Sequence, residues 1–375
     1  MTEPATDYSP SVDTAADLAE EEHVAIEGRS PWYLAWRRLR RNYIALAFLG
    51  LFFLIVICCA LAPLYSHYVA HTGPNTTHLD QTVMVDGKPK PVLSGGGFHV
   101  GSNGQLVLNG SVKVLGPTWR HAHGRFVLGA DQDGRDVAVR LLYGGITSLK
   151  VGIGSALICT LFALTLALLA GNYGGWVDWF AARLFDLIWA FPVLLLAIAL
   201  GSALTINGFH HFGINIAAGS LWIPTIVISI VLIPYVGRPL RGQILSLREK
   251  EFVEAARGMG AGPIRIMFRE LLPNVASTAL VFFTLIIATN ILTEAGLSFL
   301  GAGVQPPNAS WGVLISEGED RIATAPWLTL VPGIAIVLTV LSLNVFGDGL
   351  RDALDPRAKV KVDPEVATHE HGGDT

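Results

Sequence analysis

Long apolar runs constrain this chain more than any other feature of its sequence. The first extends from Tyr43 to Leu64, and others lie near residues 147–170, 184–206, 221–240, 275–293 and 327–347. About 20 apolar residues in a helix cross the ~30 Å hydrocarbon core of a bilayer. The chain is 51% hydrophobic and only 15% charged, so it has more apolar surface than a soluble core could bury. The sequence therefore predicts an all-α membrane protein with six transmembrane helices.

The distribution of charge predicts how these spans are oriented. An aromatic and basic segment, Trp32 to Arg41, precedes the first run, a basic segment, 351–361, follows the last, and the loop 241–274 is also rich in arginine. Cytoplasmic loops carry an excess of Lys and Arg. Because six spans return the chain to its starting side, we expect both termini and the loop 241–274 to be cytoplasmic. The formal net charge of −4 gives no support for a nucleic-acid partner.

The chain divides by composition into segments. Residues 1–30 and 358–375 are polar and aperiodic, which predicts disordered cytoplasmic tails. We expect an interface helix and the first transmembrane helix over 31–64, an extracytoplasmic insert over 65–125, and a core with the remaining spans over 126–357. The first apolar run is too long and too arginine-flanked for a cleaved signal peptide, so we expect it to be retained.

The insert 65–125 is predicted to be rich in β-structure. Asp86-Gly87 and Asn103-Gly104 each lie between short β-prone runs. Turns of this composition favour hairpins because both central residues can adopt a positive φ.

The loop after the fourth span is predicted to form two short helices over 249–273. The first would end at Gly258 or Gly260, and the second would begin with Pro263. Phe252, Val253, Ala256 and Met259 fall at helical spacing, which makes the first helix amphipathic. Small helices of this kind suit docking into a groove on a partner, although an ordinary amphipathic loop would show the same periodicity.

The same loop contains a motif with a recognisable spacing: Glu-Ala-Ala, three residues, Gly, eleven residues, then Leu-Pro. The residues in register are Glu254, Ala255, Ala256, Gly260, Leu272 and Pro273. In this motif the chain resembles the inner-membrane permeases of ATP-binding-cassette importers. Glu270 occupies a position that is usually apolar, and the dipeptide and oligopeptide branch often has a polar residue there.

Further blocks are similar to that branch, and specifically to its second, C-type permease. They cover 128–149, 294–312 and 347–357. The resemblance extends over nearly all of 32–357, except for the outward insert at about 70–120, which is longer than usual in the family. It implies the type I importer permease fold, with 126–357 as the permease core, and location in the bacterial cytoplasmic (inner) membrane.

The resemblance also implies partners. These would be a second homologous permease, two cytoplasmic ATP-binding subunits and an extracytoplasmic solute-binding protein, with the motif residues docking into an ATPase cleft. The chain has no Gly-x-x-x-x-Gly-Lys-Ser/Thr motif for phosphates. We therefore expect ATP and Mg to be bound by the partner subunits, and no cofactor, metal or catalytic residue in this chain. The expected cargo is a di- or oligopeptide.

Other functions and sites are open at this point. The same machinery could import nickel or another small solute. An ion-coupled secondary transporter would show paired broken helices in two halves, and a membrane enzyme would need facing polar clusters; the sequence shows neither clearly. Glu294, Ser298 and Phe299 are candidate pathway or interface positions because a carboxylate at membrane depth is costly. Alternatively, Glu294 sits at the outer end of its span and pairs at a subunit interface or with water.

Several histidines crowd the predicted insert and its flanks. They are His67, His71, His78, His121 and His123. They lack a clear carboxylate or cysteine partner at fixed spacing, so we predict solvated loop histidines and no metal site.

Overall fold

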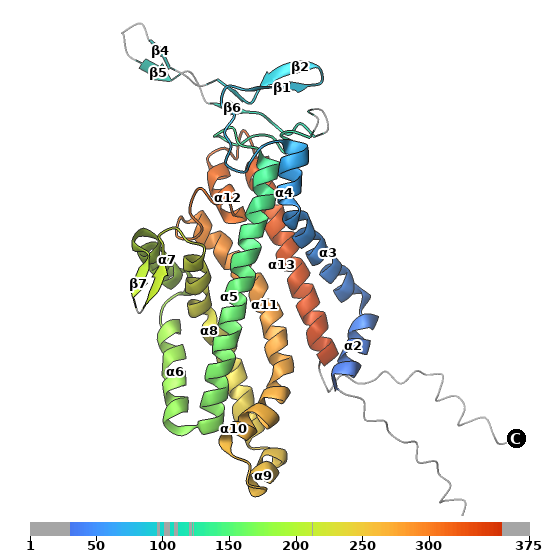
Figure 1. The fold of residues 1–375 in the computed structure, drawn as a ribbon, viewed down its shortest axis with the longest axis vertical. Coiled ribbons are helices and arrows are strands. Elements are labelled where there is room, and N and C mark those ends of the chain that lie inside the picture. Colours follow the sequence, from blue (N-terminus) through green and yellow to red (C-terminus); the bar gives the residue numbers. More distant parts are fainter. Residues whose placement is uncertain are drawn as a thin grey trace, which may run out of the picture.

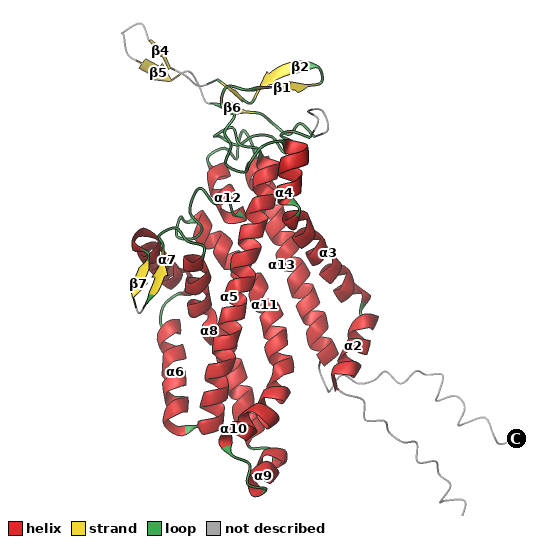
Figure 2. Ribbon diagram, in the orientation of Figure 1, coloured by secondary structure: helices red, strands yellow, loops and turns green. Residues whose placement is uncertain are grey.

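The computed structural model of the protein is a bundle of long helices with most of its short strands at one end (Figure 1). It describes residues 31–95, 98–100, 106–108, 112–119, 122, 124–211 and 213–354. Helices predominate in the part described (Figure 2). In chain order they are α2 (Pro31–Arg41), α3 (Tyr43–Ala60), α4 (Ala62–Tyr65), the π-helical turn η1 (Ser66–Ala70), α5 (Val137–Tyr173), α6 (Gly175–Trp189), α7 (Val193–Asn207), α8 (Trp222–Arg248), α9 (Glu251–Gly258), α10 (Pro263–Arg265), the π-helical turn η2 (Ile266–Leu271), α11 (Leu272–Phe299), α12 (Trp311–Glu319) and α13 (Trp327–Leu354).

The strands form small antiparallel pairs. They are β1 (Thr82–Val85) with β2 (Lys88–Pro91), β3 (Leu93–Ser94) with β6 (Lys113–Val114), β4 (Phe98–Val100) with β5 (Leu106–Leu108), and β7 (Phe209–His211) with β8 (Ile214–Ile216). Asp86 and Gly87 have φ values of 54° and 73°, so the hairpin turn predicted there is confirmed. The predicted turn at Asn103-Gly104 lies outside the described residues. We call the end of the bundle that carries β1 to β6 the strand-bearing end, and the opposite end the α9 end (Figure 1).

Within the described residues, five helical segments are long and apolar enough to cross a membrane. They are α3, α5, α8, the continuous segment Pro263–Phe299 and α13. The bent pair α6 and α7 makes a sixth if it is counted as one broken span. The predicted helical membrane protein is therefore confirmed, with a difference in its third span.

That third span, predicted as one helix over 184–206, is broken. α6 ends at Trp189 and α7 begins at Val193, with an angle of 86° between them. Pro192, at φ −55° and ψ 128°, is the N-cap of α7. It has no amide hydrogen to donate, and it disfavours helical geometry at the residue before it. The run is apolar on both sides of Pro192, so hydropathy alone does not reveal this break.

The core lies where α5, α8 and α11 pack together. Large fully buried side chains there include Ile228, Leu240 and Ile291. Glycines of α5 allow neighbouring helices to approach closely: a Cβ at Gly145 would collide with Cys59 of α3, and one at Gly152 would collide with Ile291 of α11. The bundle is thus held by contacts among helices far apart in the sequence.

The two ends of the described chain lie together in the half of the bundle opposite the strands (Figure 1). Leu39 of α2 and Ala45 of α3 share a buried cluster with Val281 of α11 and with Leu350 and Ala353 of α13. The proposed tails 1–30 and 358–375 lie outside the described residues.

Candidate functional site

The helix α9 is closed at its C-terminus by a glycine. Gly260 has a φ of +79°, its N–H donates to the Arg257 carbonyl at 2.9 Å, and the Ala261 N–H donates to the Ala256 carbonyl at 3.0 Å. This pair of bonds is the Schellman arrangement, which satisfies carbonyls at a helix end and needs a left-handed residue. The prediction of a short helix closed by glycine is confirmed: the helix ends at Gly258, and Gly260 makes the turn.

The second predicted short helix is not a separate element. It begins at Pro263 as expected, but α10, η2 and α11 continue as one 37-residue segment to Phe299. Pro273 lies in the first turn of α11, directly after the π-helical turn η2. A π-turn is an irregularity through which a helix can continue past a residue that lacks an amide hydrogen. The prediction of a separate second short helix was therefore wrong.

One side of α9 packs on the bundle, and the other is exposed. Val253 and Ala256 are buried, with Val253 in the same core cluster as Met267 and Leu271. The sequence predicted one apolar face, but Phe252 and Met259 are exposed, Met259 by 80%.

Exposed apolar side chains therefore gather at the α9 end. We call them the α9 patch, and they are Phe252, Met259, Ile264 and Phe268. Of the predicted motif residues, Glu254, Ala255, Gly260 and Pro273 are also exposed, Leu272 is half-buried and Ala256 is buried.

The C-terminal end of α5 holds both sides of the α9 segment. Arg248 Nη1 donates to the Gly171 carbonyl at 3.2 Å, and Asn172 Nδ2 donates to the Pro263 carbonyl at 3.2 Å. Nearby, Arg241 of α8 forms a bidentate pair with Asp178 of α6, at 2.5 and 2.6 Å. Bidentate guanidinium pairs fix orientation as well as distance. These contacts therefore hold in place the segment that carries the α9 patch.

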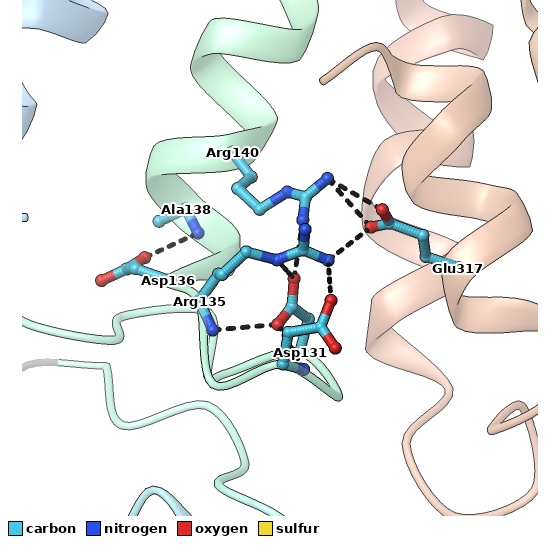
Figure 3. Close-up of polar contacts among 7 residues, drawn as sticks. Asp131, Arg135, Asp136, Ala138, Arg140 and Glu317 are labelled. Carbon is cyan, nitrogen blue, oxygen red and sulfur yellow. Dashed lines mark hydrogen bonds and ion pairs between the residues drawn. The ribbon is translucent and has the colours of Figure 1, made fainter. Parts of the chain in front are cut away.

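A cluster of ion pairs lies at the strand-bearing end (Figure 3). Arg140 of α5 is 2% exposed and donates to Asp131 at 3.0 Å and to Glu317 of α12 at 2.9 Å. Arg135 pairs with Asp131 at 2.7 Å and with Glu317 at 3.2 Å. The carboxylates and guanidinium groups therefore compensate each other where single charges would be costly. No sequence pattern indicated Glu317 as a partner, because it is 177 residues from Arg140.

Asp136 starts the long helix α5. Its carboxylate accepts from the N–H groups of Phe126 at 2.7 Å, Ala138 at 2.9 Å and Val139 at 3.2 Å. This is an N-cap that also fixes the preceding loop. Burial raises the pKa of Asp136, against the opposing effect of the three N–H donors. The block 128–149 therefore contains the N-cap of α5, Asp136, and the ion-paired residues Asp131, Arg135 and Arg140.

Glu294 and Ser298 are brought together inside the chain. Glu294 is fully buried, and Ser298 Oγ donates to Glu294 Oε1 at 2.6 Å while accepting from the Val304 N–H at 3.0 Å. Phe299 is half-buried. Within the described chain, this partner lies one turn along the same helix, and the expected pairing of Glu294 at a subunit interface or with water stays a prediction.

Hydroxyl groups from two other elements enclose the same carboxylate. Ser148 of α5 and Ser310, the N-cap of α12, both lie beside it. Ser148 Oγ also accepts from the Trp311 N–H at 3.1 Å. Among the residues described, Glu294 Oε2 has no hydrogen-bond partner within normal distance. The carboxylate therefore lies at the junction of α5, α11 and α12.

The histidines have separate surroundings. His78 is buried, with Nε2 2.7 Å from Thr72 Oγ1 and its ring against Phe126, and burial lowers its pKa. His71 caps η1 in a left-handed conformation, so the helix does not continue to it from His67. His121 and His123 lie outside the described residues. Within the described residues, no three His, Cys, Asp or Glu side chains are arranged to hold a metal ion.

Two family models match the chain. One, described as a binding-protein-dependent transport system inner membrane component, matches residues 163–360. The other, described as the N-terminal transmembrane domain of oligopeptide transport permease C, matches residues 30–82. Together they include the segment from α2 to η1 and everything from the last third of α5 to α13.

Curated relatives match over most of their length. The dipeptide transport system permease protein DppC of Alkalihalophilus pseudofirmus is 35% identical over 341 residues, which are 91% of this chain and 93% of that protein. The glutathione transport system permease protein GsiD of Pectobacterium atrosepticum is 36% identical over 88% of this chain and 93% of its own length. A putative peptide transport system permease protein of Brucella suis is 35% identical over 89% of this chain and 95% of its own.

Proposed function

Because this chain belongs to the binding-protein-dependent permeases of the inner membrane and is a C-type member of their dipeptide and oligopeptide branch, we propose that it forms, with a second homologous permease, the translocation pathway for small peptides. The relatives named above transport dipeptides, glutathione or peptides. These names do not favour nickel or another small solute as the cargo, and they do not favour ion-coupled transport. The chain is a transport component and not an enzyme.

The observation that supports coupling to a motor is the α9 patch. Phe252 of α9, Met259 at its C-terminal cap, and Ile264 and Phe268 in the segment that follows are exposed, as are Glu254 and Ala255. The other side of α9 packs on the bundle. Exposed apolar side chains on a short helix suit a groove on a partner protein. The proposed partners are two ATP-binding subunits, which hold ATP and Mg and carry out hydrolysis, while this chain holds no cofactor.

The two ends of the bundle lie on opposite sides of the membrane in this proposal. The α9 end faces the cytoplasm and the strand-bearing end faces an extracytoplasmic solute-binding protein. The arginine-rich α2, the described C-terminal end of α13 and the α9 segment all belong to the half away from the strands (Figure 1). This agrees with the excess of cations expected on cytoplasmic segments.

The experiment is peptide uptake by the reconstituted complex, with Glu254→Lys as the variant. The charge reversal acts on an exposed side chain of α9, so membrane insertion should be unaffected while ATP hydrolysis no longer drives uptake. Asp352→Lys is the control, because it reverses an exposed charge in the last turn of α13, where a cation suits the helix dipole. Normal uptake by Glu254→Lys, or recovery of tagged protein without a second permease and ATPase subunits, would contradict the proposal.

A further inference from the structure

One side of α2 carries a continuous basic and aromatic stripe. Its members are Tyr33, Trp36, Arg37, Arg40 and Arg41, which line a shallow cavity of about 300 Å³. They follow the spacing i, i+3, i+4, i+7 and i+8, so they lie on one face of the helix. The opposite face carries Ala35 and Leu39, which are buried. We call these five lining residues the arginine stripe.

The charge of the arginine stripe is uncompensated within the described part of the chain. Arg37, Arg40 and Arg41 are exposed and form no ion pair with any residue that the structure describes. The helix itself contains no Asp or Glu. Like charges three and four residues apart on a helix repel each other, so this face favours an anion that contacts several guanidinium groups at once.

The place of α2 in the chain determines which anion can reach it. Only Asn42 separates α2 from the apolar span α3, and its side chain caps α3 by accepting from the Ala45 N–H at 3.1 Å. Because a span begins one residue later, the arginine stripe lies at the membrane surface. Tyr43 and Ile44, the first residues of α3, are 79% and 67% exposed, so apolar surface adjoins the charges. Trp and Tyr are characteristic of this interfacial depth.

We propose that the arginine stripe binds the phosphate headgroup of an anionic phospholipid. Guanidinium groups bind phosphate oxygens in bidentate geometry, and the rings of Trp36 and Tyr33 suit the boundary between headgroups and acyl chains. The bound lipid would seat α2 against α13 in the cluster that also contains Leu39 and Leu350. The site is independent of the transported solute and requires only that the chain spans a membrane.

A second anion is available in the chain itself. Residues 1–30, directly before α2, contain eight Asp and Glu residues and a single arginine. Such a segment could neutralise the guanidinium groups, but its carboxylates would leave the exposed rings of Trp36 and Tyr43 uncovered. A phospholipid covers both the charges and the adjoining apolar surface, which is why we commit to the lipid.

The test is lipid retention by the whole transporter complex, counted by native mass spectrometry after titration with phosphatidylglycerol or with phosphatidylcholine of the same acyl chains. The wild type should retain phosphatidylglycerol in preference. The combined Arg37→Gln, Arg40→Gln and Arg41→Gln variant should lose at least about tenfold in that affinity, because it removes three cations that attract an anionic headgroup at the membrane surface. Lys88→Gln with Lys90→Gln is the control, because it removes cations from exposed positions of β2 at the strand-bearing end.

Further measurements distinguish the lipid from the other possible ligands. Inorganic phosphate in excess should not displace the lipid; displacement would show a site for free phosphate instead. A chain that lacks residues 1–28 should retain phosphatidylglycerol as the full chain does. If retention appears only after this truncation, the acidic segment is the occupant and the lipid proposal is wrong. Equal retention of both lipids, or no effect of the arginine substitutions, would also overturn it.

Discussion

Gly260 offers a sharp test of how the α9 segment is built, because the chain contains a matched control two residues away. Gly260 has a φ of +79° and Gly262 a φ of −72°. A Cβ added at either position would meet nothing within 4 Å. Alanine at the two sites therefore differs in backbone conformation and not in packing.

The expected cost follows from this difference. An L-residue in the left-handed region costs ~1–2 kcal/mol relative to glycine. Gly260→Ala should therefore destabilise the closed end of α9 by about that amount, a factor of roughly 5–30 in the equilibrium between its closed and open forms. Gly262 is already at a φ and ψ that alanine adopts before a proline, so Gly262→Ala should be neutral or slightly stabilising.

Hydrogen exchange of the amides of Gly260 and Ala261 measures this equilibrium directly. These amides close the helix by donating to the Arg257 and Ala256 carbonyls, so their protection should fall roughly 5–30-fold in Gly260→Ala and stay near the wild-type value in Gly262→Ala. Gly260→Asn should lie between the two, since asparagine tolerates the left-handed region. ATP-driven uptake should follow the same order.

Two outcomes would refute the reasoning. If Gly260→Ala and Gly262→Ala show equal protection, the conformation of Gly260 does not determine the closure of α9. If protection falls in Gly260→Ala while uptake is unchanged, the closed end of α9 is not needed for coupling.

Two further predictions concern the strand-bearing end. Arg140→Met should lower the free energy of unfolding by about 1–3 kcal/mol, because it removes one of the two cations that pair with Asp131 and Glu317 and leaves only Arg135. Thermal unfolding of the purified complex measures this change, and a midpoint equal to that of wild type would contradict it. His78 has a lowered pKa through burial, so the folded state binds fewer protons than the unfolded state below the usual histidine value of about 6.5. Stability of this end should therefore be highest above about pH 6.5 and decrease as the pH falls below it. His78→Gln keeps a partner for Thr72 and should remove that dependence in hydrogen exchange measured as a function of pH; an unchanged pH profile would count against the assignment.

Local chemistry allowed several elements to be predicted from the sequence. The Asp86-Gly87 turn and the Gly260 closure both depend on residues that adopt a positive φ readily, and such residues can be recognised without knowing their neighbours. The start of α5 shows the limit of hydropathy. The apolar run predicted a span from 147, whereas the helix begins at Val137 because Asp136 caps it and its first turns are held by the ion pairs of Arg140.

Proline shows why the remaining differences could not be foreseen. Pro192 ends one helix and begins another, while Pro234 of α8 and Pro332 of α13 lie inside continuous helices. All three follow apolar residues in long apolar runs. Whether a proline breaks a membrane helix depends on whether neighbouring elements can satisfy or shield the freed carbonyl, which is a property of the assembled bundle. The Glu294 junction is of the same kind, because Ser148 and Ser310 reach it from distant parts of the chain.

The continuity of Pro263–Phe299 gives the two ends of the bundle a direct mechanical connection. The segment has 37 residues, and at 1.5 Å per residue it is about 55 Å long. Its first turns carry the α9-end residues Phe268 and Pro273, and its last turns carry Glu294 and Ser298. If a partner applies a force at the α9 patch, we expect it either to distort the π-helical turn η2 or to displace Glu294 relative to Ser148, because a packed helix moves as a rigid element. Because buried hydrogen bonds hold the junction of α5, α11 and α12, we expect η2 to be the more compliant of the two points.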